Sequence, residues 1–252
     1  MVIVSGHQPV YLPWLGLIHK ASLCDVFVFM DDVQYLTQDW NNRNMIKSPQ
    51  GKAIWLTVPV DLKHSASDRL QDILISGQEH VAEKSRWQAV HWASLRMAYT
   101  RAPFFGKYKP FFEWLYLGKQ WKRLSDLNLA ILKQVFEWFD LRPKLVIGSQ
   151  EGFIGVKSDL VLEHGARYKA DIVVTGIFGR DYIDTAKFER NNIKVVFQDY
   201  HHPRYSQQYG GFVPNLSFVD LLFNHGPESR HICLQGNVTR EEICQGARST
   251  HS

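Results

Sequence analysis

The sequence has few cysteines and no long apolar segment. Its 252 residues include three scattered cysteines, Cys24, Cys233 and Cys244. This set provides neither a disulfide framework nor a zinc spacing, so it indicates a reducing compartment. No stretch reaches the roughly 18 apolar residues of a membrane span, and the N-terminal MVIVSGHQP lacks the basic start of a signal peptide. We therefore expect a cytoplasmic protein without a membrane span.

Concentrated charge and familiar catalytic motifs are also absent. The formal charge is +4, and lysines and arginines form no long run, which argues against a nucleic-acid partner. There is no G-x-S-x-G, H-E-x-x-H or Walker motif. His201 and His202 are adjacent but have no third ligand nearby in the sequence, so we expect no metal site. Anionic small molecules remain as partners.

Aromatic residues are plentiful: they make up 13% of the chain and include eight tryptophans. Such residues either fill a core or bind flat ligands such as bases and sugars. With 45% hydrophobic residues, the chain can bury a full core.

Short apolar runs alternate with helical periodicity along most of the chain. We predict strands at Val2–Ser5, Asp25–Met30, Ile54–Val60, Lys144–Ile147, Asp171–Thr175 and Lys194–Gln198, with another over Leu70–Ile75. This alternation predicts an α/β fold with a mostly parallel, open, Rossmann-like sheet in three layers. We expect a single domain over residues 1–226 with a helical insertion at about 79–140. A polar C-terminal tail is expected over 227–252.

Polar side chains follow several predicted strands. Because parallel strands bring their carboxyl ends to one edge, we expect these residues to line one ligand site. The set comprises His7, Gln8, Asp31, Asp32, Arg180, Tyr182 and His202. The alternative is that they cap strands and helices.

Individual roles remain open at this point. His7 is a general base or a neutral hydrogen-bonding residue, since an imidazole titrates near pH 6.5. Asp31 or Asp32 could bind a hydroxyl, accept a proton from an amine or hold Mg²⁺. Amides at Asn42 and Asn44 suit hydroxyl-rich ligands, although asparagine is also common in turns.

The chain resembles the WbqC-like family over about residues 2–226. The motifs that carry the resemblance are His7-Gln8-Pro9, Tyr11-Leu12-Pro13-Trp14, Asp31-Asp32-Val33-Gln34-Tyr35, Asn42-Arg43-Asn44, Trp55-Leu56-Thr57-Val58-Pro59, Gly179-Arg180-Asp181-Tyr182, His202-Pro203 and Asp220-Leu221-Leu222-Phe223-Asn224. Members are bacterial and tend to be encoded with enzymes of O-antigen and other surface polysaccharides, and of amino sugars. The resemblance therefore implies a place in such biosynthesis.

Within that context we expect a transferase that places an acyl or aminoacyl group, such as glycyl, on the amine of a nucleotide-linked amino sugar. His7 or Asp31 would deprotonate the amine, and Tyr11 and Trp14 would stack on a ring. Arg43 and Arg180 would hold phosphates. ATP with Mg²⁺ stays open as a cofactor, and so does the oligomeric state.

Two alternatives belong to other classes. A nucleotidyltransferase-like enzyme fits the early strand–helix–strand layout but lacks the histidine pair of that chemistry. A non-catalytic sugar- or protein-binding module of the polysaccharide assembly machinery is the other.

Overall fold

A computed structural model describes residues 1–76 and 82–248 of the chain. Its centre is a five-stranded sheet in the order β7-β2-β1-β8-β9, and every pairing in it is parallel. The strands are β1 (Ile3–His7), β2 (Val26–Phe29), β7 (Lys144–Ile147), β8 (Ile172–Gly176) and β9 (Lys194–Gln198). Counted along the chain, the order is 3-2-1-4-5, which is a doubly wound arrangement.

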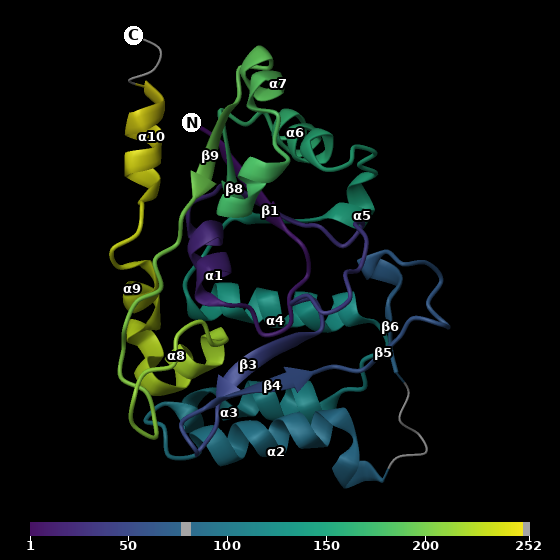
Figure 1. Ribbon diagram of the computed structural model, residues 1–252, viewed down its shortest axis with the longest axis vertical. Coiled ribbons are helices and arrows are strands. Elements are labelled where there is room, and N and C mark those ends of the chain that lie inside the picture. Colours follow the sequence, from purple (N-terminus) through teal and green to yellow (C-terminus); the bar gives the residue numbers. More distant parts are fainter. Residues whose placement is uncertain (77–81, 249–252) are drawn as a thin grey trace.

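Alternate residues of these strands enter two separate hydrophobic clusters, one on each face of the sheet. Ile3 and Phe27 belong to the first cluster, whereas Val4 and Val26 belong to the second. The first face packs against α1 (Leu15–Ser22) and α4 (Leu124–Trp138), and the second against α6 (Ser158–Arg167) and α7 (Thr185–Arg190). Burial on both faces explains why the inner strands β2 and β8 are nearly continuous apolar runs. Figure 1 shows these three layers, which confirm the predicted α/β fold.

The third predicted strand does not join the sheet. Residues 53–57 form β4 (Ala53–Thr57), which pairs antiparallel with β3 (Arg43–Lys47) in a separate hairpin. Its side chains are mostly exposed, with Leu56 buried, so it is not buried on both faces as strands of the central sheet are. A strand is therefore present over most of the predicted range Ile54–Val60, but the expectation that it belongs to the parallel sheet is wrong.

A second small pairing joins β5 (Val60–Asp61) to β6 (Leu74–Ile75). The predicted strand over Leu70–Ile75 is wrong in its first half, because Leu70–Asp72 is the 3-10 helix η1. Most of the helices between β6 and β7 lie beyond the β3–β4 hairpin, at the bottom of Figure 1. They are η2 (Glu83–Ser85), α2 (Trp87–Tyr99), α3 (Phe105–Glu113) and the π-helix η3 (Trp114–Gly118), while α4 returns to cover the sheet. The expected start of the helical insertion, near residue 79, lies outside the described residues.

The chain closes along one side of the molecule, on the left in Figure 1. There α8 (Phe218–His225), η5 (Gly226–Glu228), α9 (Ser229–Leu234) and α10 (Arg240–Arg248) follow one another. Cys233 of α9 is completely buried and donates from Sγ to the carbonyl of Leu15 in α1. The segment that we expected to be a polar tail thus contributes helices to the fold. No helix within the described ranges combines the length and hydropathy that a membrane crossing needs.

Candidate functional site

The sheet opens between the carboxyl ends of β1 and β8. The β1–β8 pairing ends at Ser5 and Val174, while β8 remains paired with β9 as far as Gly176 and Gln198. These two central strands also send their following helices, α1 and α7, to opposite faces of the sheet. Such a switch point is where open α/β sheets bind ligands. We call the sheet edge beyond Ser5 and Val174, where β1 and β8 are no longer paired, the switch-point opening.

His7 is the last residue of β1 and lies beside this opening. Its Nδ1 is 2.9 Å from the carbonyl oxygen of Gln8 and donates to it, so Nε2 carries no hydrogen and is an acceptor. Burial of the ring, reinforced by the charge of Lys20, lowers the pKa of His7 to about 3. The imidazole is therefore neutral at physiological pH.

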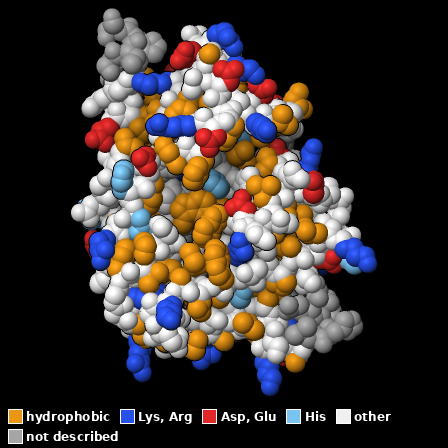
Figure 2. Space-filling view, in the orientation of Figure 1, with side chains coloured by type: hydrophobic (Ala, Val, Ile, Leu, Met, Phe, Trp, Pro, Cys, Tyr) orange, Lys and Arg blue, Asp and Glu red, His pale blue; other side chains and the backbone are white. Residues whose placement is uncertain are grey.

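Three indole rings continue from His7 toward the β3–β4 hairpin. The ring centroids of His7 and Trp14 are 5.2 Å apart, those of Trp14 and Trp40 5.9 Å, and those of Trp40 and Trp55 5.3 Å. Trp55 of β4 is 48% exposed, and the Arg43 guanidinium lies 4.7 Å from its ring centroid. We call His7, Trp14, Trp40 and Trp55 the aromatic row. Figure 2 shows hydrophobic side chains gathered in the middle of one face of the molecule, beside a histidine and an acidic group.

Hydrogen-bonded side-chain amides connect Gln8, the residue after His7, to α4. The Asn41 side-chain nitrogen donates to Gln8 Oε1 and to the carbonyl of Pro9, and Asn128 Nδ2 donates to the carbonyl of Asn41. Asn128 of α4 is completely buried, and its Oδ1 has no hydrogen-bond partner among the described residues. His7 and Asn128 both line a cavity of about 10 Å³, the size of a single water probe. Sequence reasoning missed Asn128, because a polar residue within a helical period gives no signal of its surroundings.

Asp31 and Asp32 follow the end of β2 and contact the residues that follow β7. Asp31 accepts hydrogen bonds from the backbone nitrogen and the hydroxyl of Ser149, both 2.8 Å long. Asp32 Oδ1 is buried without a partner, next to Gly148. Burial raises the pKa of both carboxyls, and the hydrogen bonds from Ser149 oppose this rise in Asp31. Asp31 thus holds the short helix α5 (Gly148–Glu151) in place, and Asp32 keeps one free carboxylate oxygen.

Three predicted ligand-binding residues have structural partners in the core. Tyr11 is fully buried, and its hydroxyl contacts His91 Nδ1 at 2.8 Å and the hydroxyl of Tyr116. Asn42 donates to the carbonyl of Val58, and Asn44, also fully buried, donates to those of Tyr11 and Leu12. These side chains anchor the β1–α1 loop to the hairpin. In this structure no face of the Tyr11 ring reaches the surface.

The remaining predicted residues follow β8 and β9. Arg180 lies in the 3-10 helix η4 (Ile177–Asp181) with its guanidinium 5.4 Å from the Phe197 ring centroid, and Tyr182 is exposed. His202 stacks with Tyr205, and burial lowers its pKa. The parallel strands place these groups at the same edge of the sheet as His7. However, the contacts described for them do not join them to the aromatic row.

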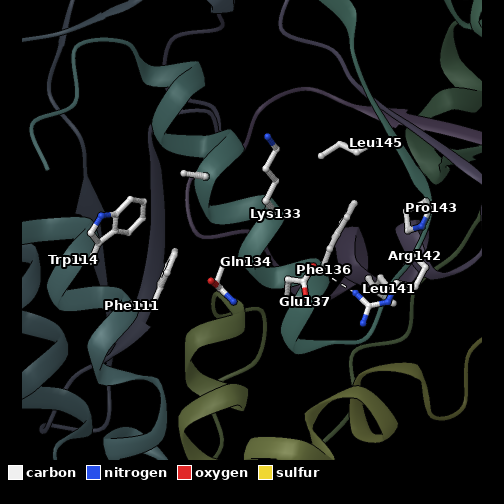
Figure 3. Close-up of a pocket in the computed structure, with 11 residues that line it drawn as sticks. Phe111, Trp114, Lys133, Gln134, Phe136, Glu137, Leu141, Arg142, Pro143 and Leu145 are labelled. Carbon is white, nitrogen blue, oxygen red and sulfur yellow. Dashed lines mark ion pairs between the residues drawn. The ribbon is translucent and has the colours of Figure 1, made fainter. Parts of the chain in front are cut away.

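A separate cavity of about 810 Å³ lies between α3, α4 and the start of β7. Figure 3 shows Phe111 and Trp114 on one side of it, residues 141–145 on the other, and α4 residues between, including the ion pair of Glu137 with Arg142. Because it reaches β7 at its amino end, it lies away from the switch-point opening. Within residues 1–76 and 82–248, no group of three or more His, Cys, Asp or Glu side chains is placed to hold a metal ion.

The fold defines a doubly wound α/β protein whose switch point lies between β1 and β8. The chain belongs to the WbqC-like protein family, whose sequence model matches residues 8–232. It is also 32% identical over 223 residues to the uncharacterized protein Rv1507c of Mycobacterium tuberculosis, a match that covers 88% of this chain and 93% of that protein. No solved structure gives a significant match. Family membership is consistent with a role related to polysaccharide biosynthesis.

Proposed function

We propose that the protein is a bacterial surface-polysaccharide biosynthesis enzyme, of the O-antigen kind, that acylates the amine of a nucleotide-linked amino sugar. The transferred group is an acyl or aminoacyl group such as glycyl. The observation that carries the proposal is the aromatic row, which leads from exposed Trp55 to His7 at the switch-point opening. Aromatic rings stack on bases and on the apolar faces of sugars, and family membership supports the biosynthetic context.

His7 would receive the amine. Its Nε2 is a hydrogen-bond acceptor. Because the pKa of His7 is about 3, far below that of an amine, His7 does not take a proton from the sugar ammonium. An attacking amine becomes strongly acidic once its bond to the acyl carbon forms. His7 would accept a hydrogen bond from the neutral amine and draw off the proton only in the transition state. Asp31 and Asp32 are less suited, because Ser149 occupies Asp31 and Asp32 packs against Gly148.

Two arginines, Arg43 and Arg180, are candidate partners for the anionic part of the substrate. Arg43, which lies over Trp55, would meet a phosphate next to a stacked base. Arg180 is exposed after β8 and would meet phosphate from that side. If the acyl group is activated here with ATP, Mg²⁺ would come with the nucleotide phosphates, since the described residues hold no group of three or more His, Cys, Asp or Glu side chains that could bind a metal ion.

Mass spectrometry of the reaction mixture tests the proposal. The protein is incubated with a uridine- or thymidine-diphosphate amino sugar, glycine and MgATP, and separately with a pre-activated acyl thioester. The expected product is the nucleotide sugar increased by one acyl or aminoacyl residue, absent when the amino sugar is replaced by its hydroxy analogue. An unchanged amino sugar under both donor conditions would overturn the proposal.

The nucleotidyltransferase-like alternative has one specific observation in its favour, the strand order around the switch-point opening. It predicts release of inorganic diphosphate from a nucleoside triphosphate when a sugar phosphate is present, with no acylated product. A non-catalytic module predicts thermal stabilisation by nucleotide sugars and no covalent change. The same incubations therefore separate all three functions.

A further inference from the structure

Lys20 of α1 is a buried cation without an acidic partner. The residue is 5% exposed, and its Nζ donates one hydrogen bond, 3.0 Å long, to the carbonyl oxygen of Gly6. A lysine ammonium has three donors, so two have no acceptor within residues 1–76 and 82–248. Across the same residues, no ion pair within 4.0 Å includes Lys20. Fully buried lysines are rare unless paired, because their desolvation is costly.

The carbonyl that Lys20 contacts faces the switch-point opening. The His7 carbonyl accepts from Met30, which follows β2, and successive carbonyls of a strand point to opposite sides. The Gly6 carbonyl must therefore point toward β8. Since the β1–β8 pairing ends at Ser5 and Val174, Lys20 occupies the position that a β8 donor would otherwise take. The ammonium thus stands where the two strands separate.

The loop that follows β1 has little capacity to bind an anion through its backbone. Doubly wound proteins often hold phosphate with a glycine-rich turn whose N–H groups point at the ligand. Here the turn from Gln8 to Trp14 contains Pro9 and Pro13, which have no N–H. A side-chain cation can provide the charge compensation at this strand end.

We propose that Lys20 binds an anionic group of the ligand in the switch-point opening, and that this group is the diphosphate of a nucleotide-linked sugar. The diphosphate identity rests on the proposed function, whereas the anion site depends only on the surroundings of Lys20. Phosphate oxygens would accept from the two free N–H groups and supply the missing negative charge. The aromatic row, which starts at neighbouring His7, would then hold the base or the sugar.

Anion binding at Lys20 should change the number of protons bound to the protein, and this change can be measured. Burial lowers the pKa of Lys20 to about 8, so a fraction of the side chain is neutral at pH 8. His7 and Cys24, which interact electrostatically with Lys20, do not titrate there: the pKa of His7 is lowered to about 3 and that of Cys24 is raised to about 12. A bound anion favours the charged ammonium, and binding should therefore take up a fraction of a proton from solution.

Calorimetric titration of the full chain tests the site at pH 8 and physiological salt. The probes are uridine diphosphate, thymidine diphosphate, uridine and acetate, with each diphosphate measured in two buffers of different ionisation enthalpy. For the wild type we expect a diphosphate to bind with proton uptake, and uridine and acetate to bind far more weakly. Lys20→Met, which fills the same space without charge, should weaken diphosphate binding by about 10- to 100-fold and abolish the proton uptake. Lys20→Arg should retain most of the affinity.

The matched control is Lys144→Met, which removes the same charge from an exposed lysine at the amino end of β7. It should change diphosphate affinity by less than about 2-fold, since exposed charges are screened by salt. Three results would each overturn the proposal. They are a diphosphate affinity of Lys20→Met equal to that of the wild type, binding by the wild type without proton uptake, and no binding of either diphosphate. Tighter binding of acetate would assign the site to a carboxylate and overturn the diphosphate. Lys20-dependent diphosphate binding without any acylated product would instead leave the anion site standing and remove the proposed function.

Discussion

The imidazole of His7 meets the indole of Trp14 edge to face, with their ring planes at 79°. The other side of the imidazole is fixed by the hydrogen bond from Nδ1 to the carbonyl of Gln8. These two contacts set the ring orientation at the strand end and leave Nε2 as the acceptor. A ligand that stacks along the aromatic row is thereby placed next to one defined hydrogen-bonding atom.

Truncation of Trp55 should weaken ligand binding without unfolding the protein. The side chain is 48% exposed, so little core is lost in Trp55→Ala. Loss of one stacked ring should weaken binding of a nucleotide sugar by about 5- to 150-fold, since stacking on an aromatic contributes about 1–3 kcal/mol. Calorimetry with uridine- and thymidine-diphosphate sugars gives the affinity, and thermal melting verifies the fold.

A matched control for that variant is Trp114→Ala in η3. Trp114 is 43% exposed but lines the separate cavity beside α4. We expect nucleotide-sugar affinity within about 2-fold of the wild type, because the ring lies outside the aromatic row. Equal losses in both variants would show that the effect does not come from stacking at the row.

The central sheet was predictable because its strands are short apolar runs, and β1, β2 and β8 at its centre are largely buried. Residues 144–147 and 194–198, for example, have the predicted bounds. The β3–β4 hairpin was not predictable in the same way. Its first strand begins with Arg43 and Asn44, which read as a polar turn, and its second resembles a buried strand in composition although it is largely exposed. Composition alone does not tell how many faces of a strand are covered.

The candidate site was predictable only in outline. Chain direction in a parallel sheet places the residues after each strand at one edge, and this singled out His7 and Asp31. Which polar residue is free and which is already satisfied depends on distant partners: Asn44 donates to the carbonyl of Leu12, 32 residues away. Lys20 was missed for the same reason, since a lysine in an amphipathic helix normally points to water.

Acid should destabilise the protein below pH 6.5 through its buried histidines. Burial lowers the pKa of His164 to about 4, whereas in the unfolded chain it titrates near 6.5. The unfolded state therefore binds a proton first, and stability present above pH 6.5 is lost as the pH falls toward 4. Between pH 7 and 5 this residue alone should account for about 2 kcal/mol. His164→Leu should lose correspondingly less stability over that interval in urea unfolding.

Comparing the wild type with His164→Leu separates the contribution of the histidine to the pH dependence of stability from that of the carboxyls. Burial raises the pKa of Asp31, Asp32 and Asp220, so their protonation on acidification favours the folded state and opposes the loss. That contribution is common to wild type and His164→Leu and cancels in their difference. His201→Gln, which removes an exposed imidazole, is the control and should not reproduce the effect of His164→Leu. An unchanged slope in His164→Leu would contradict the prediction.

Gly148 should tolerate no side chain because of Asp32. An alanine Cβ at this position would lie 2.5 Å from Asp32 Oδ1 and 3.0 Å from its Cγ. We expect Gly148→Ala to cost about 1–3 kcal/mol, as overpacking does. The cost should shrink in an Asp32→Ala background, where the clashing carboxyl is gone. Gly106→Ala, with no atom within 4 Å of the new Cβ, should be neutral or mildly stabilising in the same urea unfolding series.

His7 should affect turnover much more than stability. If its Nε2 receives the proton of the attacking amine, His7→Ala should lower turnover by roughly 10²–10⁴-fold while nucleotide-sugar affinity changes little. Because the pKa of His7 is about 3, its own titration should leave no inflection in the rate between pH 5 and 8. Turnover by mass spectrometry across that pH range and affinity by calorimetry are the two measurements.

His7→Asn separates a chemical role from a structural one. An asparagine amide can imitate one hydrogen bond of the ring but cannot take up a proton. If His7 is the acceptor of the reacting proton, this variant should keep the melting temperature and the ligand affinity of the wild type and remain as slow as His7→Ala. If the ring only supports the β1–α1 loop through the Gln8 carbonyl, His7→Ala should melt earlier, and His7→Asn should restore melting temperature and rate together. Near-normal turnover in His7→Asn would therefore remove His7 from the chemistry and leave Asp32, with its free carboxylate oxygen, as the next group to test.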